Sequence, residues 1–256
     1  MPGGPFDSSK TRVAPFFDAL VEKDPSGRTW LPELVSLPEY GSSTTPSVSG
    51  ELVDSAWGEN ERALPAPPSL LAWLVRNLKC PSSMKEERIR PERRELIQGD
   101  EQRIEEGLRL LEDEPRHRAW YVLEGPSYPD AYLATSDAIV VIEGKRTEAG
   151  PTSSTTWMPV RSQMLRHLDA AFDLAGPRAL YGFFMVEGPE DGAIPEGWRE
   201  AALGTLAPDL IEKSLPHRST RERDLIRDAF LGVTTWQRAC RVLGVATGRL
   251  PDEVPR

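Results

Sequence analysis

The fold is decided by residues 120–148, which read WYVLEGPSYPDAYLATSDAIVVIEGKRTE. The stretch predicts three short strands, at 121–124, 131–135 and 138–143, because each segment is apolar or rich in β-branched and aromatic residues. Only Ser136 and Asp137 separate the second strand from the third. This spacing favours a tight hairpin between them.

The hairpin brings charged residues together at its open end. If Thr135 faces Ala138, counting outward along both strands places Asp130 directly opposite Glu143. Directly opposed residues share a face of the sheet at about 4.5–5.5 Å, and like charges there repel. Lys145 follows Glu143 by two positions and so lies on that face as well. The sequence therefore predicts two carboxylates and one ammonium at one point, where a divalent cation would relieve the repulsion.

Pro129-Asp130 at a strand start, followed by Glu143-Gly144-Lys145 at the end of the next strand, resembles the signature of the PD-(D/E)XK nuclease superfamily. The resemblance covers roughly residues 99–187. It implies an α/β fold with an αβββαβ restriction-endonuclease-like core and a four-stranded mixed sheet. It also implies a Mg²⁺ or Mn²⁺ ion held by Asp130, Glu143 and the backbone carbonyl of Gly144.

Lys145 would then orient the attacking water or stabilise the transition state, and both roles stay open here. A neighbouring cation and partial burial would each lower its pKa, which would also permit a role as a base. The competing interpretation is a surface ion pair between Glu143 and Lys145, with Asp130 as a turn residue after proline.

Two further catalytic candidates lie on helices. The related nucleases often add an acid from the helix before the first strand, and Glu101 matches that position, with Glu105 as the alternative. Glu101 could instead be a first-turn residue of a helix that begins after residues 98–100. Gln163 lies on the helix after Glu-x-Lys, where related nucleases often carry a polar residue that contacts phosphate or water. A plain helix-surface amide is the other interpretation.

Other polar residues near the motif have weaker claims. Arg146, Arg161 and Arg166 are candidates for phosphate contacts, although each is also an ordinary surface arginine by sequence. Glu124 ends the first predicted strand and is a candidate for a place near the metal. Trp157 follows a turn-rich loop, where it either packs in the core or forms a cleft wall.

The rest of the chain predicts helices and one more strand. A helix at 160–175 precedes an apolar strand at 179–187, which we expect to be central. We therefore divide the chain into an N-terminal helical and irregular extension at 1–84, a nuclease-like core at 85–190, and a C-terminal helical extension at 191–256. No residue of the first segment points to chemistry, so we expect it to cap the core or to select partners.

The amino-acid composition limits the classes of protein to which the chain can belong. Of 256 residues, 39% are hydrophobic, enough for a sizeable core, and the two cysteines, Cys80 and Cys240, suit a reducing cytoplasm. No apolar run approaches the 18 residues or so of a membrane span. The histidines are scattered, and neither a Ser/His/Asp grouping nor a glycine-rich phosphate loop is evident. The formal net charge of −9 argues against a protein that coats nucleic acid, but not against a nuclease.

The sequence thus predicts a cytoplasmic, Mg²⁺- or Mn²⁺-dependent nuclease without membrane attachment. DNA is expected over RNA from the resemblance, as is a place in defence or repair. An RNA-directed nuclease remains an alternative. So does a catalytically silent binding or scaffold module in a larger complex, and a protein partner or a homodimer stays open.

Overall fold

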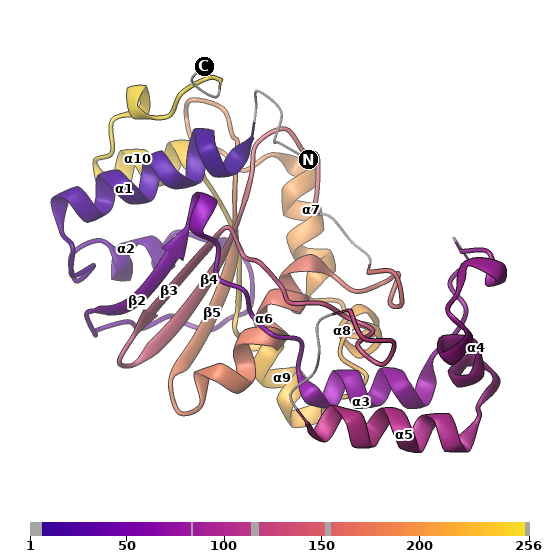
Figure 1. Ribbon diagram of the computed structural model, residues 1–256. Coiled ribbons are helices and arrows are strands. Elements are labelled where there is room, and N and C mark those ends of the chain that lie inside the picture. Colours follow the sequence, from indigo (N-terminus) through magenta and orange to yellow (C-terminus); the bar gives the residue numbers. More distant parts are fainter. Residues whose placement is uncertain (1–6, 83, 114–117, 152–154, 254–256) are drawn as a thin grey trace.

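A six-stranded mixed sheet forms the centre of the molecule in the computed structural model, which describes residues 7–82, 84–113, 118–151 and 155–253 (Figure 1). The strands lie in the order β1-β6-β5-β4-β3-β2. β4 runs parallel to β5, and β5 runs parallel to β6, while the other neighbours are antiparallel. The strands are β1 (Glu39–Tyr40), β2 (Leu52–Trp57), β3 (Ala131–Thr135), β4 (Ala138–Lys145), β5 (Ala179–Val186) and β6 (Phe230–Thr235).

The predicted hairpin is confirmed. Ala131 pairs with Ile142 and Tyr132 pairs with Val141, which is the register that places Asp130 opposite Glu143. The Thr135 hydroxyl closes the turn, because it accepts a hydrogen bond of 2.9 Å from the backbone N–H of Ala138. The expected central position of the fourth strand is confirmed too, since β5 lies between β4 and β6.

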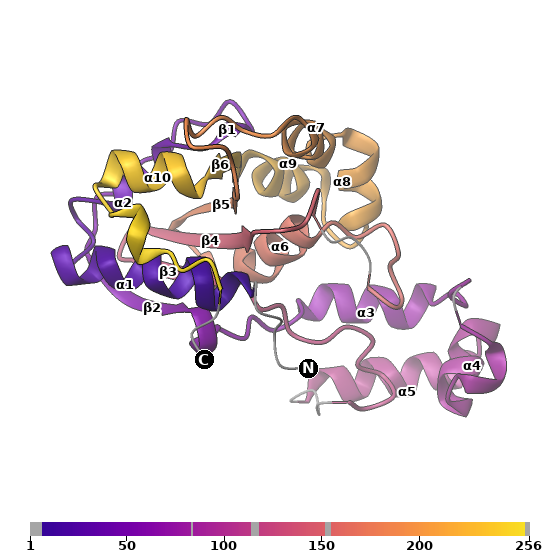
Figure 2. The same ribbon diagram turned by 90° about the horizontal axis from the view of Figure 1, so that it is seen from above.

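Helices cover both faces of the sheet (Figures 1 and 2). One face carries α1 (Ala14–Lys23), α2 (Leu31–Ser36) and α10 (Trp236–Leu243), and the other carries α6 (Gln163–Ala175), α7 (Glu196–Thr205), α8 (Pro208–Ser214) and α9 (Thr220–Asp228). Successive residues of β4 alternate between the two cores: Val140 packs in the first and Val141 in the second. A strand covered on both faces reads as a continuous apolar run, as residues 138–142 do.

A separate helical unit lies between β2 and β3 in the sequence. It comprises α3 (Pro68–Asn77), α4 (Pro91–Gln98) and α5 (Glu101–Glu112), and it has its own core, which includes Leu74 and Leu96. In Figure 1 these helices project beside the sheet rather than over it. Short helical turns complete the chain at Ser9–Val13, Gly58–Asn60, Glu86–Arg88 and Thr247–Arg249.

The prediction of a strand at 121–124 was wrong. These residues, all in the described part of the chain, lie in turns and irregular backbone, and Tyr121 and Leu123 are buried against the helical unit. Their apolar side chains therefore serve a helical core instead of the sheet. The second neighbour of β3, besides β4, is β2 from the N-terminal segment.

The predicted four-stranded sheet also differs from the structure. β1 and β2 come from the segment expected to be an N-terminal extension, and β6 comes from the expected C-terminal helical extension. Residues 230–235 (FLGVTT) lie between helices and are short, so their strand character is weak in the sequence. No helix of the described residues is both long enough and apolar enough to cross a membrane.

Candidate functional site

Asp130, Glu143 and Lys145 meet at the open end of the β3–β4 hairpin. They are only 8%, 4% and 7% exposed, and Lys145 Nζ lies 2.8 Å from Glu143 Oε1. This burial is incompatible with the alternative of a surface ion pair. The three side chains form a compact cluster of buried charge, which costs free energy unless the charges compensate one another.

Asp130 is fixed by two hydrogen bonds. Its Oδ2 accepts from the backbone N–H of Gly144 at 2.7 Å, and its Oδ1 accepts from the Ser9 hydroxyl at 3.0 Å. Ser9 belongs to the helical turn that precedes α1, so the N-terminal segment contributes directly to this site. Burial and the nearby Glu143 carboxylate raise the pKa of Asp130 to about 8. A cation at this carboxyl would replace the proton.

Glu143 is the centre of the hydrogen-bond network. Its Oε1 accepts from the Gln163 amide at 2.6 Å and from Lys145, and its Oε2 lies 2.9 Å from His167 Nε2. Burial alone would raise the pKa of this carboxyl. The hydrogen bond and charge of His167 and the charge of Lys145 outweigh it and hold the pKa of Glu143 below its ordinary value.

Lys145 is held as an ammonium. Burial alone would lower its pKa, but the charges of Glu143 and Asp130 raise the pKa of Lys145 above its ordinary value. The lowered pKa expected from the sequence assumed a cation beside Lys145, so it stays a prediction for the cation-bound protein. The two partners agree, since a lowered pKa for Glu143 and a raised one for Lys145 both describe a favourable ion pair.

Gln163 reaches the site from the first position of α6. Its amide nitrogen donates to Glu143, while its Oε1 is buried and has no hydrogen-bond partner among the described residues. A buried acceptor without a donor costs about 1–3 kcal/mol. This oxygen is therefore suited to accept from a water or to approach a cation.

Behind Glu143 runs a hydrogen-bond chain that the sequence analysis missed. His167 Nδ1 lies 2.7 Å from the Ser127 hydroxyl, so Ser127, His167 and Glu143 form a line. An ionised carboxylate only accepts, so Nε2 carries the proton and orients the ring toward Glu143. Ser127 is 2% exposed, which leaves its hydroxyl inaccessible as a nucleophile. These hydrogen bonds therefore position Glu143. The signal for them in the sequence is that Gln163 and His167 are four residues apart, which places both on the same face of a helix.

Glu61 is a further carboxylate that the sequence did not reveal. It directly follows the helical turn after β2, and its carboxyl feels the charges of Glu143 and Asp7. Partial desolvation and these two neighbours raise the pKa of Glu61. Glu61 thus lies close enough to the cluster for its carboxyl to interact with the charge of Glu143.

Glu101 does not join the cluster. It is the exposed first residue of α5, whose N-terminus is capped by Asp100, and it lies in the helical unit beside the sheet (Figure 1). This is the first-turn alternative of the sequence analysis. Glu105 on the same helix is exposed as well. Both α1 and α2 precede the first strands of the sheet along the chain, whereas α5 follows β2.

The three arginine candidates are engaged by the protein itself. Arg161 is 1% exposed and lies 2.7 Å from Asp169 Oδ2 and 3.1 Å from Glu124 Oε1. Arg166 contacts Glu124 and two backbone carbonyls, and Arg146 contacts Thr11 and the carbonyl of Asp252. Arg161 in particular is a buried structural residue.

The donor set at the hairpin fits a hard divalent cation. Mg²⁺ binds oxygen, keeps several waters and typically uses one or two protein carboxylates, which Asp130 and Glu143 would supply. Within the described ranges, no three His, Cys, Asp or Glu side chains group as a metal site, so the protein's own ligands would be few. The backbone N–H of Gly144 is committed to Asp130, while a ligand role for its carbonyl stays a prediction.

No protein-family model matches the chain, and no curated protein and no solved structure is significantly similar to it. The function therefore has to be inferred from the chain's own geometry.

Proposed function

We propose that the protein hydrolyses phosphodiester bonds of nucleic acid, DNA first, with Mg²⁺ or Mn²⁺ at the hairpin site. The observation that carries this proposal is the buried cluster of Asp130, Glu143 and Lys145, whose carboxylates are too close for both to ionise freely. Two acids whose pKa values are pushed apart, beside a fixed ammonium, are typical of a catalytic centre. A structural ion pair would need only one carboxylate.

The order of elements supports the same proposal. Apart from α2 and β1, which lie between α1 and β2, the elements run α1, β2, β3, β4, α6, β5. They give a helix, three antiparallel strands, a helix and a parallel strand, with the α3–α5 unit inserted between β2 and β3. We read this as an elaborated αβββαβ nuclease core, with β1 and β6 as additions on one edge.

Each side chain of the site has a separate role in the proposed reaction. A bound divalent cation would supply Lewis-acid charge for the scissile phosphate and the attacking water. Asp130 and Glu143 would hold it, while Gln163 Oε1 accepts a hydrogen bond from a water beside them. Lys145, as an ammonium, stabilises the charge that develops on the phosphoryl oxygens. In the protein without a cation, the raised pKa of Lys145 is consistent with this electrostatic role.

Cleavage assays test the proposal. Supercoiled plasmid, linear single- and double-stranded DNA, and RNA are offered with Mg²⁺, Mn²⁺ or EDTA. We expect cation-dependent cleavage that falls by about 10²–10³-fold in Lys145→Ala, the usual loss for one charge-stabilising donor. Lys213→Ala removes an exposed lysine from α8 and should cleave like the wild type.

The assay also separates the alternatives. Nicked plasmid indicates an endonuclease, and preference for RNA would replace DNA as the substrate. Equal cleavage by wild type and Lys145→Ala would refute the assignment of the site. If no substrate is cut and Mg²⁺ leaves the melting temperature unchanged, the fold acts as a binding or scaffold module instead.

A further inference from the structure

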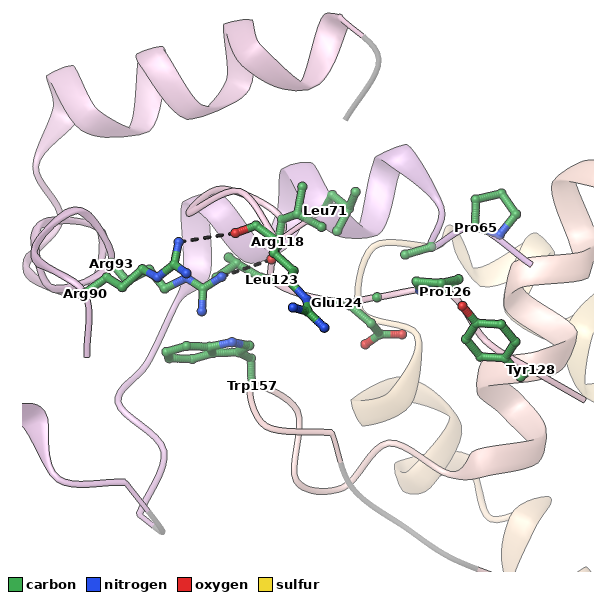
Figure 3. A pocket seen from close by; sticks show the side chains of 13 residues that line it. Pro65, Leu71, Arg90, Arg93, Arg118, Leu123, Glu124, Pro126, Tyr128 and Trp157 are labelled. Carbon is green, nitrogen blue, oxygen red and sulfur yellow. Dashed lines mark hydrogen bonds between the residues drawn. The ribbon is translucent and has the colours of Figure 1, made fainter. Parts of the chain in front are cut away.

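A pocket of about 670 Å³ lies between the helical unit and the loop that leads to Asp130 (Figure 3). Its floor is apolar and includes Leu71 and Leu123, both of which are buried. This volume falls in the range of pockets that hold small ligands, which typically pair an apolar lining with a few placed polar groups. None of the candidate catalytic residues at the hairpin lines it.

Three arginines line the pocket: Arg90, Arg93 and Arg118. Arg93 is anchored, since it donates to the backbone carbonyls of Trp120 at 2.8 Å and Val122 at 3.1 Å. Arg90 and Arg118 are exposed, and Figure 3 shows the Arg118 side chain extending into the pocket beside Glu124. Such a concentration of positive charge, in a protein with a formal net charge of −9, points to an anionic ligand.

Two aromatic residues also line the pocket. The Arg93 guanidinium lies over the Trp157 ring at 5.3 Å from its centroid, which fixes the indole in place. Tyr128 is half exposed, and in Figure 3 it lies on the side of Glu124 away from Trp157. Aromatic side chains and arginine planes are the surfaces on which unstacked nucleic-acid bases lie.

The pocket is also lined by Glu124, which carries a buried acceptor without a hydrogen-bond partner. Glu124 is only 5% exposed, and its Oε1 is occupied by Arg161 and Arg166. Its Oε2 is buried without a hydrogen-bond partner in the described part of the chain. A buried carboxylate oxygen without a donor is costly, so the site fits a ligand that brings an N–H group.

The pocket adjoins the candidate catalytic site. Tyr128 precedes Asp130 by two residues, so their Cα atoms lie at most about 7 Å apart. Arg166, three residues after Gln163 on α6, also donates to the carbonyls of Gly125 and Pro126 in the pocket wall. A nucleic-acid strand, which advances about 3.4 Å per nucleotide in a duplex, would span both places within a few nucleotides.

We propose that this pocket binds one unpaired nucleotide of the strand that is cut at the hairpin site. The base stacks on the aromatic walls and donates an amino group to Glu124 Oε2, while Arg90 and Arg118 contact its phosphate. The link to a cut strand rests on the proposed nuclease function. Binding of the nucleotide does not, and it is testable without cleavage.

Calorimetric titration in EDTA measures this binding directly. The ligands are the 5′-monophosphates of deoxycytidine and deoxyuridine, inorganic phosphate, and a five-residue cytidine DNA strand. We expect deoxycytidine monophosphate to bind more tightly than its deoxyuridine analogue, which carries an oxygen in place of the exocyclic amino group and whose base has only a ring N–H as a donor. Phosphate alone should bind more weakly than either, and the strand should bind more tightly than the single nucleotide.

Variants connect the binding to the named residues. Trp157→Ala and Arg118→Ala should each weaken binding of deoxycytidine monophosphate by about tenfold, the scale of one stacked base or one phosphate contact. Glu124→Gln should abolish the preference for the amino-bearing base. Arg109→Ala is the matched control, because it removes an exposed arginine from α5 outside the pocket and should change nothing.

The outcomes are distinct from those of the cleavage assay. No nucleotide binding, or equal binding by wild type, Trp157→Ala and Arg118→Ala, would overturn the pocket assignment even if the protein cuts DNA. Equal affinity for the two pyrimidine nucleotides would overturn the role of Glu124. A strand that binds no tighter than one nucleotide would indicate a site for free nucleotides, against our proposal. Nucleotide binding that persists without any cleavage would support the pocket and contradict the nuclease.

Discussion

Replacing Lys145 by methionine keeps most of the stem but removes the ammonium from the buried cluster. Glu143 then retains the donors on His167 and Gln163 but loses the cation at 2.8 Å. Breaking a buried ion pair on one side costs about 3–5 kcal/mol in the free energy of unfolding. Because Glu143 keeps two hydrogen-bond donors, we expect Lys145→Met to lower the free energy of unfolding by about 3 kcal/mol, the lower end of this range.

The reciprocal change, Glu143→Gln, leaves the ammonium with Asp130 as its remaining buried carboxyl neighbour. Asp130 can then ionise, which compensates part of the charge, so we expect a loss of about 2 kcal/mol. The double variant carries neither member of the pair. It should therefore lose less stability than the sum of the single changes, with a coupling of about 2 kcal/mol.

Urea unfolding in EDTA at pH 7 measures all four proteins, with fluorescence and circular dichroism as paired probes to check for a two-state transition. If the loss in the double variant is about 2 kcal/mol smaller than the sum of the two single losses, the result supports a desolvated ion pair between Glu143 and Lys145. Single-variant effects that add to within about 0.5 kcal/mol would contradict a buried ion pair between Glu143 and Lys145, because an exposed pair is worth at most about 1 kcal/mol.

Three further predictions follow from particular side chains. The folded pKa of Asp130, about 8, exceeds its ordinary value of 3.8, so the folded state keeps this proton longer. In EDTA, the free energy of unfolding should therefore fall as the pH rises from about 4 to 8. Calorimetry should find a smaller dependence of this free energy on pH in Asp130→Asn. Cys80 is exposed, whereas burial raises the pKa of Cys240 to about 11, so a thiol reagent should label one cysteine natively and both in denaturant. Gly144→Ala should lower stability by about 1–3 kcal/mol in urea unfolding, because its Cβ would lie 3.0 Å from the buried Trp236 ring; an unchanged midpoint would contradict this packing.

The hairpin and its charged end could be predicted because the determining interactions are local. Only Ser136 and Asp137 separate β3 from β4, so turn chemistry and alternation set the register that aligns Asp130 with Glu143. Lys145 follows from the two-residue period of a strand. The burial of all three side chains did not follow from their charge.

What the sequence missed depends on contacts between distant segments. β2 pairs with β3 across the whole α3–α5 unit, and its sequence LVDSAW lacks the long apolar run of a central strand. Residues 121–124 look like a strand because they are apolar and β-prone, yet tertiary packing against helices decides their conformation. Ser9 joins the site from the helical turn before α1 and Ser127 from a loop, and neither residue's spacing from the hairpin in the sequence indicates that it lies close to the site.

The carboxylate cluster itself is tested most directly by cation binding, because cleavage also depends on offering the right substrate. We would titrate Mn²⁺ into the wild type and into Asp130→Asn by calorimetry at pH 8, where the wild-type carboxyl is about half ionised. We expect one Mn²⁺ to bind per chain in the wild type, and at least tenfold weaker binding in Asp130→Asn. Equal Mn²⁺ binding by the two proteins, or none by the wild type, would contradict a cation site at Asp130 and Glu143.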